Sequence, residues 1–229
     1  MRLYSIQPLA VYDHLCREGR FHSRPLAYPD SNLAYYRDDF AYVLAYEWLM
    51  TKMMARGLPR PAPDVYPIWA FFQWYGVARP KPDLRCCGLK DWGRRERKVL
   101  LTVEIPANQV LLSDYYGWLN CINYGHAGTS REYQAFFRRF DRAGGQRRWD
   151  QPLAEPWHQE LLASWDRVLD LETSRRQAGI KKADHAIQAT FWAVTAEQVK
   201  AAVAFGGGRR RERLPVPNRI GSRNVRLAG

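Results

Sequence analysis

The chain has 229 residues, a formal net charge of +12 at pH 7 and a hydrophobic fraction of 46%. A folded domain of this length buries roughly 70% of the surface that its unfolded chain exposes, so a real core is expected. The sequence has no run of about 18 apolar residues and no secretory signal pattern at its start, which excludes a membrane-spanning protein and predicts a soluble, cytoplasmic one.

The first third of the sequence predicts one strand and two helices. Residues 1–8 alternate as a strand does, a helix follows over residues 9–17, and Gly19 is a natural helix stop. A longer helix is expected from about Leu33 to Met54, because aromatic and apolar residues recur there at spacings of three and four.

The middle of the sequence predicts three strands and a helix. The aromatic run after Pro67 predicts a buried strand that ends at Gly76. Two further strands are expected over residues 99–104 and 110–112. Ser113 or Asp114 is expected to cap the helix that carries Trp118.

The last third predicts two helices separated by a strand. Residues 157–172 form a helical apolar face, and residues 187–194 read as a strand. A helix is expected after that strand, because Thr195 and Gln198 have the spacing of a capping box.

These elements predict a single α+β domain over residues 1–205, with a central mixed or split β-sheet flanked by helices. Residues 206–229 are rich in glycine and arginine, and this composition predicts a flexible basic tail.

The positive charge favours an acidic partner such as nucleic acid, because a basic surface concentrates phosphates. Arginines cluster in the tail and at residues 92–98 and 136–149. The tail is explained equally well as a solvated segment that aids solubility. Aromatic residues interleave with the arginines of residues 136–149, which suits stacking on bases, but an ordinary amphipathic helix is the favoured interpretation.

Several catalytic signatures are missing. The four cysteines lack C-x-x-C spacing and the five histidines lack an H-E-x-x-H pattern, so we expect reduced thiols and no metal site. No P-loop or strand-linked G-x-G-x-x-G occurs, which disfavours ATPases and Rossmann dehydrogenases. Ser113 and Asp114 have no histidine near them in the sequence and make no hydrolase triad.

Glu104 is a candidate catalytic acid at the end of the strand over residues 99–104. Strand alternation puts the Glu104 side chain on the other face of the strand from Leu101 and Val103, so it faces a cleft or solvent. A carboxylate that lines a cleft acts as an acid, a base or a cation stabiliser. An exposed acid on the sheet is the favoured alternative.

A charged triplet follows two prolines in the middle of the chain. Lys81, Asp83 and Arg85 occupy alternate positions of an extended segment and therefore share a face. Lys81 and Arg85 are candidates to hold a phosphate, with Asp83 orienting Arg85. A surface ion pair explains the triplet equally well.

Gln7 and Gln188 are polar residues in otherwise apolar strands. A buried amide needs partners for its donors and its acceptor. Each glutamine is therefore either a structural crosslink, which is the favoured interpretation, or a residue that recognises an amide or the edge of a base through hydrogen bonds.

Several blocks stand in order along the chain: "RLYSIQPLAVYDHLCREG", "YPIWAFFQW", "KPDLR", "VLLTVEIPANQVLLSDYYGW", "SWDRVLDLE" and "IQATFWAV". Together they resemble an uncharacterised bacterial family, a domain of unknown function similar to DUF3841. The resemblance covers nearly the whole chain to about residue 205 and brings no activity with it.

The first strand "RLY", the helix ending at Gly19 and the strand "VLLTVEIP" before "VLLSD" are also similar to the ADP-ribosyltransferase-like fold. This likeness implies an NAD cleft in a split sheet. It implies that Arg2 or Gln7 lies near the dinucleotide and that Tyr4 or Trp69 packs against the nicotinamide. Many members carry a glutamate in the last strand, where this chain has Gln188, so Glu104 would have to supply the carboxylate.

Two functional hypotheses follow. The first is an NAD-dependent, ADP-ribosyltransferase-like enzyme that modifies nucleic acid or protein, with Glu104 and Gln188 as its catalytic residues. The second is a non-catalytic nucleic-acid-binding or regulatory module that uses the arginine clusters. The sequence leaves the oligomeric state open.

Overall fold

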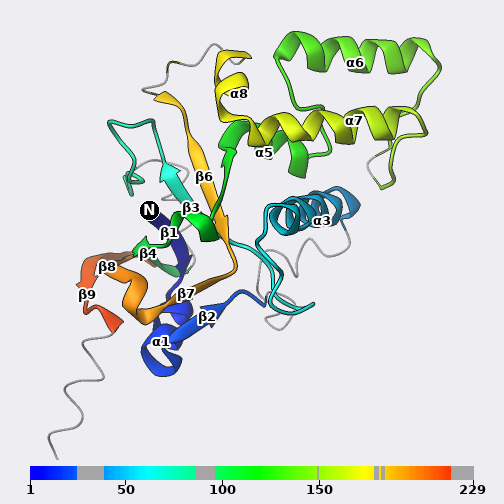
Figure 1. Ribbon diagram of the computed structural model, residues 1–229. Coiled ribbons are helices and arrows are strands. Elements are labelled where there is room, and N and C mark those ends of the chain that lie inside the picture. The colour runs from blue at the N-terminus through cyan, green and yellow to red at the C-terminus, as the bar shows by residue number, and fades with distance from the viewer. Residues whose placement is uncertain (25–38, 86–95, 149, 178–180, 182–183, 218–229) are drawn as a thin grey trace, which may run out of the picture.

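A large antiparallel sheet forms the centre of the molecule (Figure 1). The computed structural model describes residues 1–24, 39–85, 96–148, 150–177, 181 and 184–217. Within these residues, seven strands pair in the order β5-β6-β3-β1-β4-β8-β9, and β2 and β7 form a separate small sheet. The strands are β1 (Arg2–Pro8), β2 (Arg20–His22), β3 (Ile68–Gln73), β4 (Arg97–Glu104), β5 (Leu111–Asp114), β6 (Ile187–Phe191), β7 (Ala193–Thr195), β8 (Val199–Gly206) and β9 (Arg209–Leu214).

Helices cover the two faces of the sheet unequally. Helix α1 lies near β2 at one end of the molecule, whereas α3, α5, α6 and α7 gather at the other (Figure 1). The α-helices are α1 (Leu9–Glu18), α3 (Phe40–Ala55), α5 (Tyr115–Ile122), α6 (Ser130–Arg142), α7 (Trp157–Trp165) and α8 (Leu171–Gln177). Short 3-10 turns occupy η2 (Ala107–Gln109), η3 (Asp166–Leu169) and η5 (Ala196–Gln198).

Each face of the sheet packs into its own core. Leu3, Leu101 and Ala189 belong to a cluster that includes Leu15 of α1. On the opposite face, Leu111 of β5 packs into a larger cluster formed mainly by α3, α5, α6 and α7. This arrangement confirms the predicted α+β domain, although every pairing of the described strands is antiparallel and none makes the sheet mixed.

Local signals explain where several elements begin and end. Gly19 ends α1 in the left-handed conformation at φ 70°, as predicted. Asp114, one of the two predicted caps, accepts a hydrogen bond from the Gly117 N–H at the start of α5. Helix α3 begins at Phe40 after the cap Asp39, and the predicted helical residues 33–38 lie outside the described part of the chain.

The helix predicted after Thr195 is wrong. The capping box of Thr195 and Gln198 is present, but it encloses only a 3-10 turn, and residues 199–206 form β8. Strand β8 pairs with β4 on one side and β9 on the other, so tertiary pairing overrides the local helical signal.

The predicted tail boundary at residue 206 also needs correction. Gly206, Gly207 and Gly208 have φ values of 81°, 61° and 70°, and they turn the chain from β8 into β9. Side chains are disfavoured at such angles, so the glycines make a hairpin here. Residues 209–214 therefore extend the sheet, and residues 218–229 lie outside the described range.

Candidate functional site

Strand pairing brings four residues distant in sequence into one row across the sheet. Ser113 of β5 lies opposite Gln188 of β6, which lies opposite Phe71 of β3. Phe71 in turn lies opposite Tyr4 of β1. Because directly paired residues point to the same side of a sheet, these four side chains share one face. We call this set the cross-strand row.

Two polar groups of the cross-strand row are buried without a hydrogen-bond partner. Ser113 is 0% exposed and Gln188 is 5% exposed. Among the described residues, neither the Ser113 Oγ nor the Gln188 Nε2 finds an acceptor or donor. An unsatisfied buried polar group costs about 1–3 kcal/mol, so such groups are normally completed by water or a ligand.

Aromatic rings pack around Phe71, the strand partner of Gln188. The Phe71 ring lies 4.6 Å from the Trp74 ring and 5.5 Å from the Tyr115 ring, measured between centroids. Burial raises the pKa of the Tyr115 hydroxyl, and the protonated hydroxyl can donate a hydrogen bond. The row thus combines aromatic rings with a few polar groups, the types of residue that line many ligand sites.

Trp69 shares this face but is engaged in the core. It lies opposite Thr190, two residues along the strand from Phe71. Its ring lies 4.7 Å from that of Trp118, and its Nε1 donates a hydrogen bond to the Tyr46 hydroxyl at 2.9 Å. These contacts make Trp69 a crosslink between the sheet and helices α3 and α5.

Gln7 points to the opposite face, with Leu3 and Ser5. Its Nε2 donates to the Ser5 Oγ at 2.8 Å, and the Ser5 Oγ donates to the backbone oxygen of Trp69 at 2.5 Å. Gln7 is therefore bonded within its own strand, and Ser5 links that strand to β3. The structure therefore does not bring Gln7 to Gln188.

Arg2 and Glu104 form an ion pair on the same face as Tyr4. They are direct partners of β1 and β4, with 2.9 Å between the Arg2 Nη2 and the Glu104 Oε1. The hydrogen bond from Arg2 lowers the pKa of Glu104 from its ordinary value. Their side chains are 62% and 43% exposed, which resembles the predicted exposed acid more than a buried catalytic one.

Glu104 and Gln188 do not meet. Strands β3 and β1 separate β6 from β4 in the sheet order. At about 4.8 Å per strand, the two residues lie roughly 14 Å apart or more. The two side chains therefore do not contact each other, and a ligand that reaches both must span the strands between them.

The segment with Lys81, Asp83 and Arg85 alternates as predicted. These three residues are exposed, whereas Leu84 between Asp83 and Arg85 is buried against Leu100. The Arg85 side chain donates to both carboxylate oxygens of Asp83, at 2.8 and 2.9 Å. Hydrogen bonding from Arg85 lowers the pKa of Asp83 to about 2. Asp83 therefore orients Arg85, as expected, and partly neutralises it.

A buried histidine–aspartate pair lies at the end of β5 nearest the cross-strand row. The His185 Nε2 lies 2.5 Å from the Asp114 Oδ2, and both side chains are 4% exposed. The sequence showed no histidine close to Asp114, because the two are 71 positions apart and only the β5–β6 pairing joins them. Ser113 precedes Asp114 and points to the other face, so the three residues do not form a triad.

Two arginines of the cluster at residues 136–149, Arg139 and Arg147, lie against aromatic rings. Phe136 and Phe140 of α6 are buried. Arg139 pairs with Glu160 and lies 5.5 Å from the Trp157 ring, and Arg147 lies 4.5 Å from the Phe137 ring. This is the amphipathic helix favoured from the sequence. In the cluster at residues 92–98, only residues 96–98 are described, and Arg97 there pairs with Glu212.

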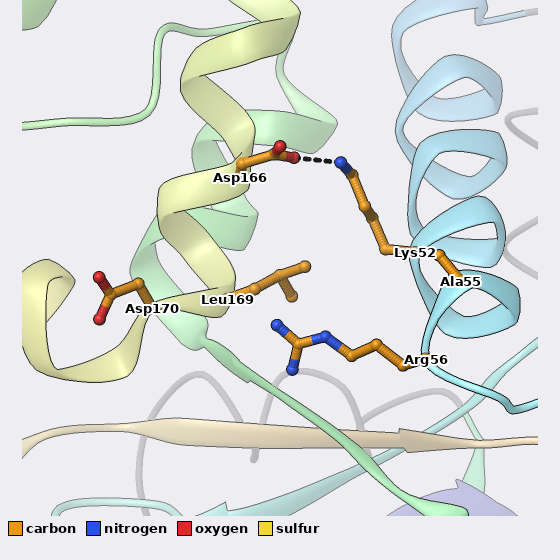
Figure 2. Close-up of a pocket in the computed structure, with 6 residues that line it drawn as sticks. All are labelled: Lys52, Ala55, Arg56, Asp166, Leu169 and Asp170. Atoms are coloured by element: carbon orange, nitrogen blue, oxygen red, sulfur yellow. Dashed lines mark ion pairs between the residues drawn. The ribbon is translucent and has the colours of Figure 1, made fainter.

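Figure 2 shows a separate pocket of about 220 Å³ between α3 and the η3–α8 segment. Lys52 reaches from α3 to Asp166, with 2.5 Å between the Lys52 Nζ and the Asp166 Oδ1. The lining combines both charges and contains no residue proposed from the sequence. It consists of Lys52, Ala55, Arg56, Asp166, Leu169 and Asp170.

Within the described ranges, no group of three His, Cys, Asp or Glu residues is arranged to hold a metal ion. None of the described helices is long and apolar enough to cross a membrane.

The fold and site define an α+β domain with a buried polar and aromatic row across an antiparallel sheet. Residues 2–200 match the family described as Domain of unknown function (DUF3841), and the chain belongs to that family. The chain has no significant match among curated proteins or among solved structures.

Proposed function

We propose that this chain is an NAD-dependent transferase of the ADP-ribosyltransferase type, and that the cross-strand row holds the nicotinamide end of the cofactor. The observation that carries the proposal is the pair of unpartnered buried groups on Ser113 and Gln188. A carboxamide and ribose hydroxyls supply the donors and acceptors that these groups lack.

The other residues of the proposed site are assigned from the exposure of their side chains. Tyr4 is half-buried beside Phe71 and offers a ring for the nicotinamide. Arg2, at the exposed end of β1, and the pair of Lys81 and Arg85 are the candidates for the diphosphate. Trp69 and Gln7 are left out of this site, because other contacts already engage their polar atoms.

The reaction breaks the bond between the ribose C1′ and the nicotinamide nitrogen. Nicotinamide leaves with the bonding electron pair, an acceptor oxygen or nitrogen attacks C1′, and the acceptor loses its proton. Positive charge develops on the ribose as the bond breaks. Glu104 is ionised at neutral pH, as an ordinary glutamate is, and the hydrogen bond from Arg2 lowers its pKa further. It stabilises the positive charge when the ribose lies at the Tyr4 end of the row, beside the Arg2–Glu104 pair.

The test is an NAD titration that follows the thermal midpoint and nicotinamide release. A ligand at 100 times its Kd adds about 2.7 kcal/mol of stability, which corresponds to a rise of about 5–10 °C for a chain of this size. We expect Gln188→Leu to abolish the shift, and Glu104→Gln to abolish release while keeping the shift. Glu47→Gln, an exposed acid on α3, is the matched control.

Each outcome separates a part of the proposal. No shift at millimolar NAD in the wild-type chain refutes the cofactor. A shift that persists in Gln188→Leu places NAD elsewhere on the molecule. Full nicotinamide release by Glu104→Gln removes Glu104 from the mechanism.

A further inference from the structure

Strand β9 is an exposed edge strand composed largely of arginine. It ends the sheet order and pairs only with β8 among the described strands. Its first five residues are exposed, and four of them are Arg209, Arg210, Arg211 and Arg213. This charge is held on a rigid hairpin instead of a free tail.

The acidic residues nearest to these four arginines pair with other side chains. The acidic residue of the strand, Glu212, pairs with Arg97 of β4 on one face. In the part of the chain that the structure describes, no ion pair or hydrogen bond engages the four β9 guanidinium groups. By contrast, Arg139 of α6 pairs with Glu160, and Arg147 in the following turn lies against the Phe137 ring.

The strand register gives the arginines a defined direction. Arg213 lies opposite Val203, and Val203 lies opposite Leu100. Arg213 therefore points to the face that carries Tyr4, and Arg211 points the same way two residues earlier. Alternate residues of a strand are roughly 6.8 Å apart, so Arg211 and Arg213 form a short positive row on this face, and a register shift separates them from Arg209 at the hairpin.

The positive row continues onto the neighbouring segment. Arg211 lies close enough to Asp83 to contribute to its lowered pKa. Asp83 holds Arg85, and Lys81 is exposed on the same segment. The surface formed by β9 and residues 81–85 thus gathers Arg211, Arg213, Lys81 and Arg85 around Asp83, and Arg209 and Arg210 extend its positive charge along the exposed edge strand.

We propose that this surface binds the phosphodiester backbone of a nucleic acid. Free guanidinium groups in a row form bidentate hydrogen bonds with successive phosphates, and they do so without reading bases. The competing explanation is that the arginines only prevent other sheets from pairing with this edge, a role that needs charge but no bound partner. The proposal does not depend on NAD binding.

The test measures fluorescence anisotropy of labelled 12-nucleotide probes of one mixed sequence, as single-stranded RNA, single-stranded DNA and duplex DNA. The variant Arg209→Gln/Arg211→Gln/Arg213→Gln should bind at least about tenfold more weakly, and its slope of log affinity against log salt should fall by about 2 to 3. The probe that binds most tightly identifies the kind of nucleic acid.

Three full-length variants serve as controls. Arg131→Gln/Arg138→Gln/Arg142→Gln removes the same charge from exposed positions of α6 and should bind as the wild type does. Arg209→Lys/Arg211→Lys/Arg213→Lys keeps the charge and should retain most of the binding, which shows that the strand still folds. Arg219→Gln/Arg223→Gln/Arg226→Gln tests the last residues of the chain.

The proposal is overturned by any of three results. These are no binding of any probe at 50 mM salt, equal losses in the β9 and α6 variants, or a loss confined to the variant at residues 219–226.

Discussion

Removing the hydroxyl of Ser113 should stabilise the protein. Ser113 is 0% exposed and its Oγ has no partner within the described residues, so the hydroxyl is desolvated without compensation. Relief of that penalty is worth about 1 kcal/mol, the lower end of the range for an unsatisfied buried group. For a 229-residue chain, Ser113→Ala should raise the thermal midpoint by about 2–4 °C.

Thr190→Val provides the matched comparison. Thr190 is also 0% exposed and lies on the same face, in the strand that pairs with β5. Its hydroxyl, however, donates to the backbone oxygen of Leu111 at 3.3 Å. Deleting it should lower the free energy of unfolding by about 1 kcal/mol, opposite in sign to the effect of Ser113→Ala.

Urea denaturation of both variants, without added ligand, checks this pair of signs. If Ser113→Ala destabilises the protein as much as Thr190→Val does, the Ser113 hydroxyl is already satisfied, and the main support for a ligand at the cross-strand row is gone. If the signs differ as expected, the sequence keeps a destabilising group at this position, which is typical of functional sites.

Three further predictions concern other parts of the structure. Asp114→Ala removes a helix cap and the partner of His185 together, so it should lower the free energy of unfolding by about 3 kcal/mol or more. Asp39→Ala removes only the exposed cap of α3, so it should lower that free energy by about 1 kcal/mol. Urea titration of both variants checks the difference. Hydrogen bonds from the Thr129 backbone and hydroxyl and from Arg167 lower the pKa of Glu132 from 4.5 to about 2. The stability that ionised Glu132 contributes is therefore fully present above pH 4.5 and is lost as the pH falls toward 2. Glu132→Gln should accordingly make the free energy of unfolding depend less on pH within that window. Cys121 is 0% exposed and burial raises its pKa, so peptide mapping after alkylation of the native protein should find Cys121 unmodified and half-buried Cys16 modified more readily.

The sequence predicts most strands and helices because their signals are local. Alternation and turn residues are enough to place β1, β3 and β4, and Gly19 marks the end of α1. The signal fails at β8, where alanines and a capping box favour a helix and only pairing with β4 and β9 decides otherwise. The same pairing converts the predicted start of a tail into an edge strand.

The candidate site is predicted only in part, for a related reason. Gln188 stands out in the sequence as a polar residue in an apolar strand, and the structure places it in the buried row. Ser113 and Phe71 do not stand out, because their importance depends on lying opposite Gln188. The register between strands 70 to 120 positions apart is the information that local patterns lack.

The two proposed surfaces share Lys81 and Arg85, but the residues that test them are far enough apart to be changed independently. Five strand spacings separate Gln188 on β6 from β9, or roughly 24 Å. At 0.15 M salt, charges more than about 8 Å apart are largely screened. Replacing the β9 arginines should therefore leave the NAD-dependent thermal shift unchanged, and Gln188→Leu should leave nucleic-acid affinity unchanged. A parallel loss of both activities in either variant would mean that one ligand spans the sheet, or that the variant has lost its fold, and the thermal midpoint without ligand distinguishes these two cases.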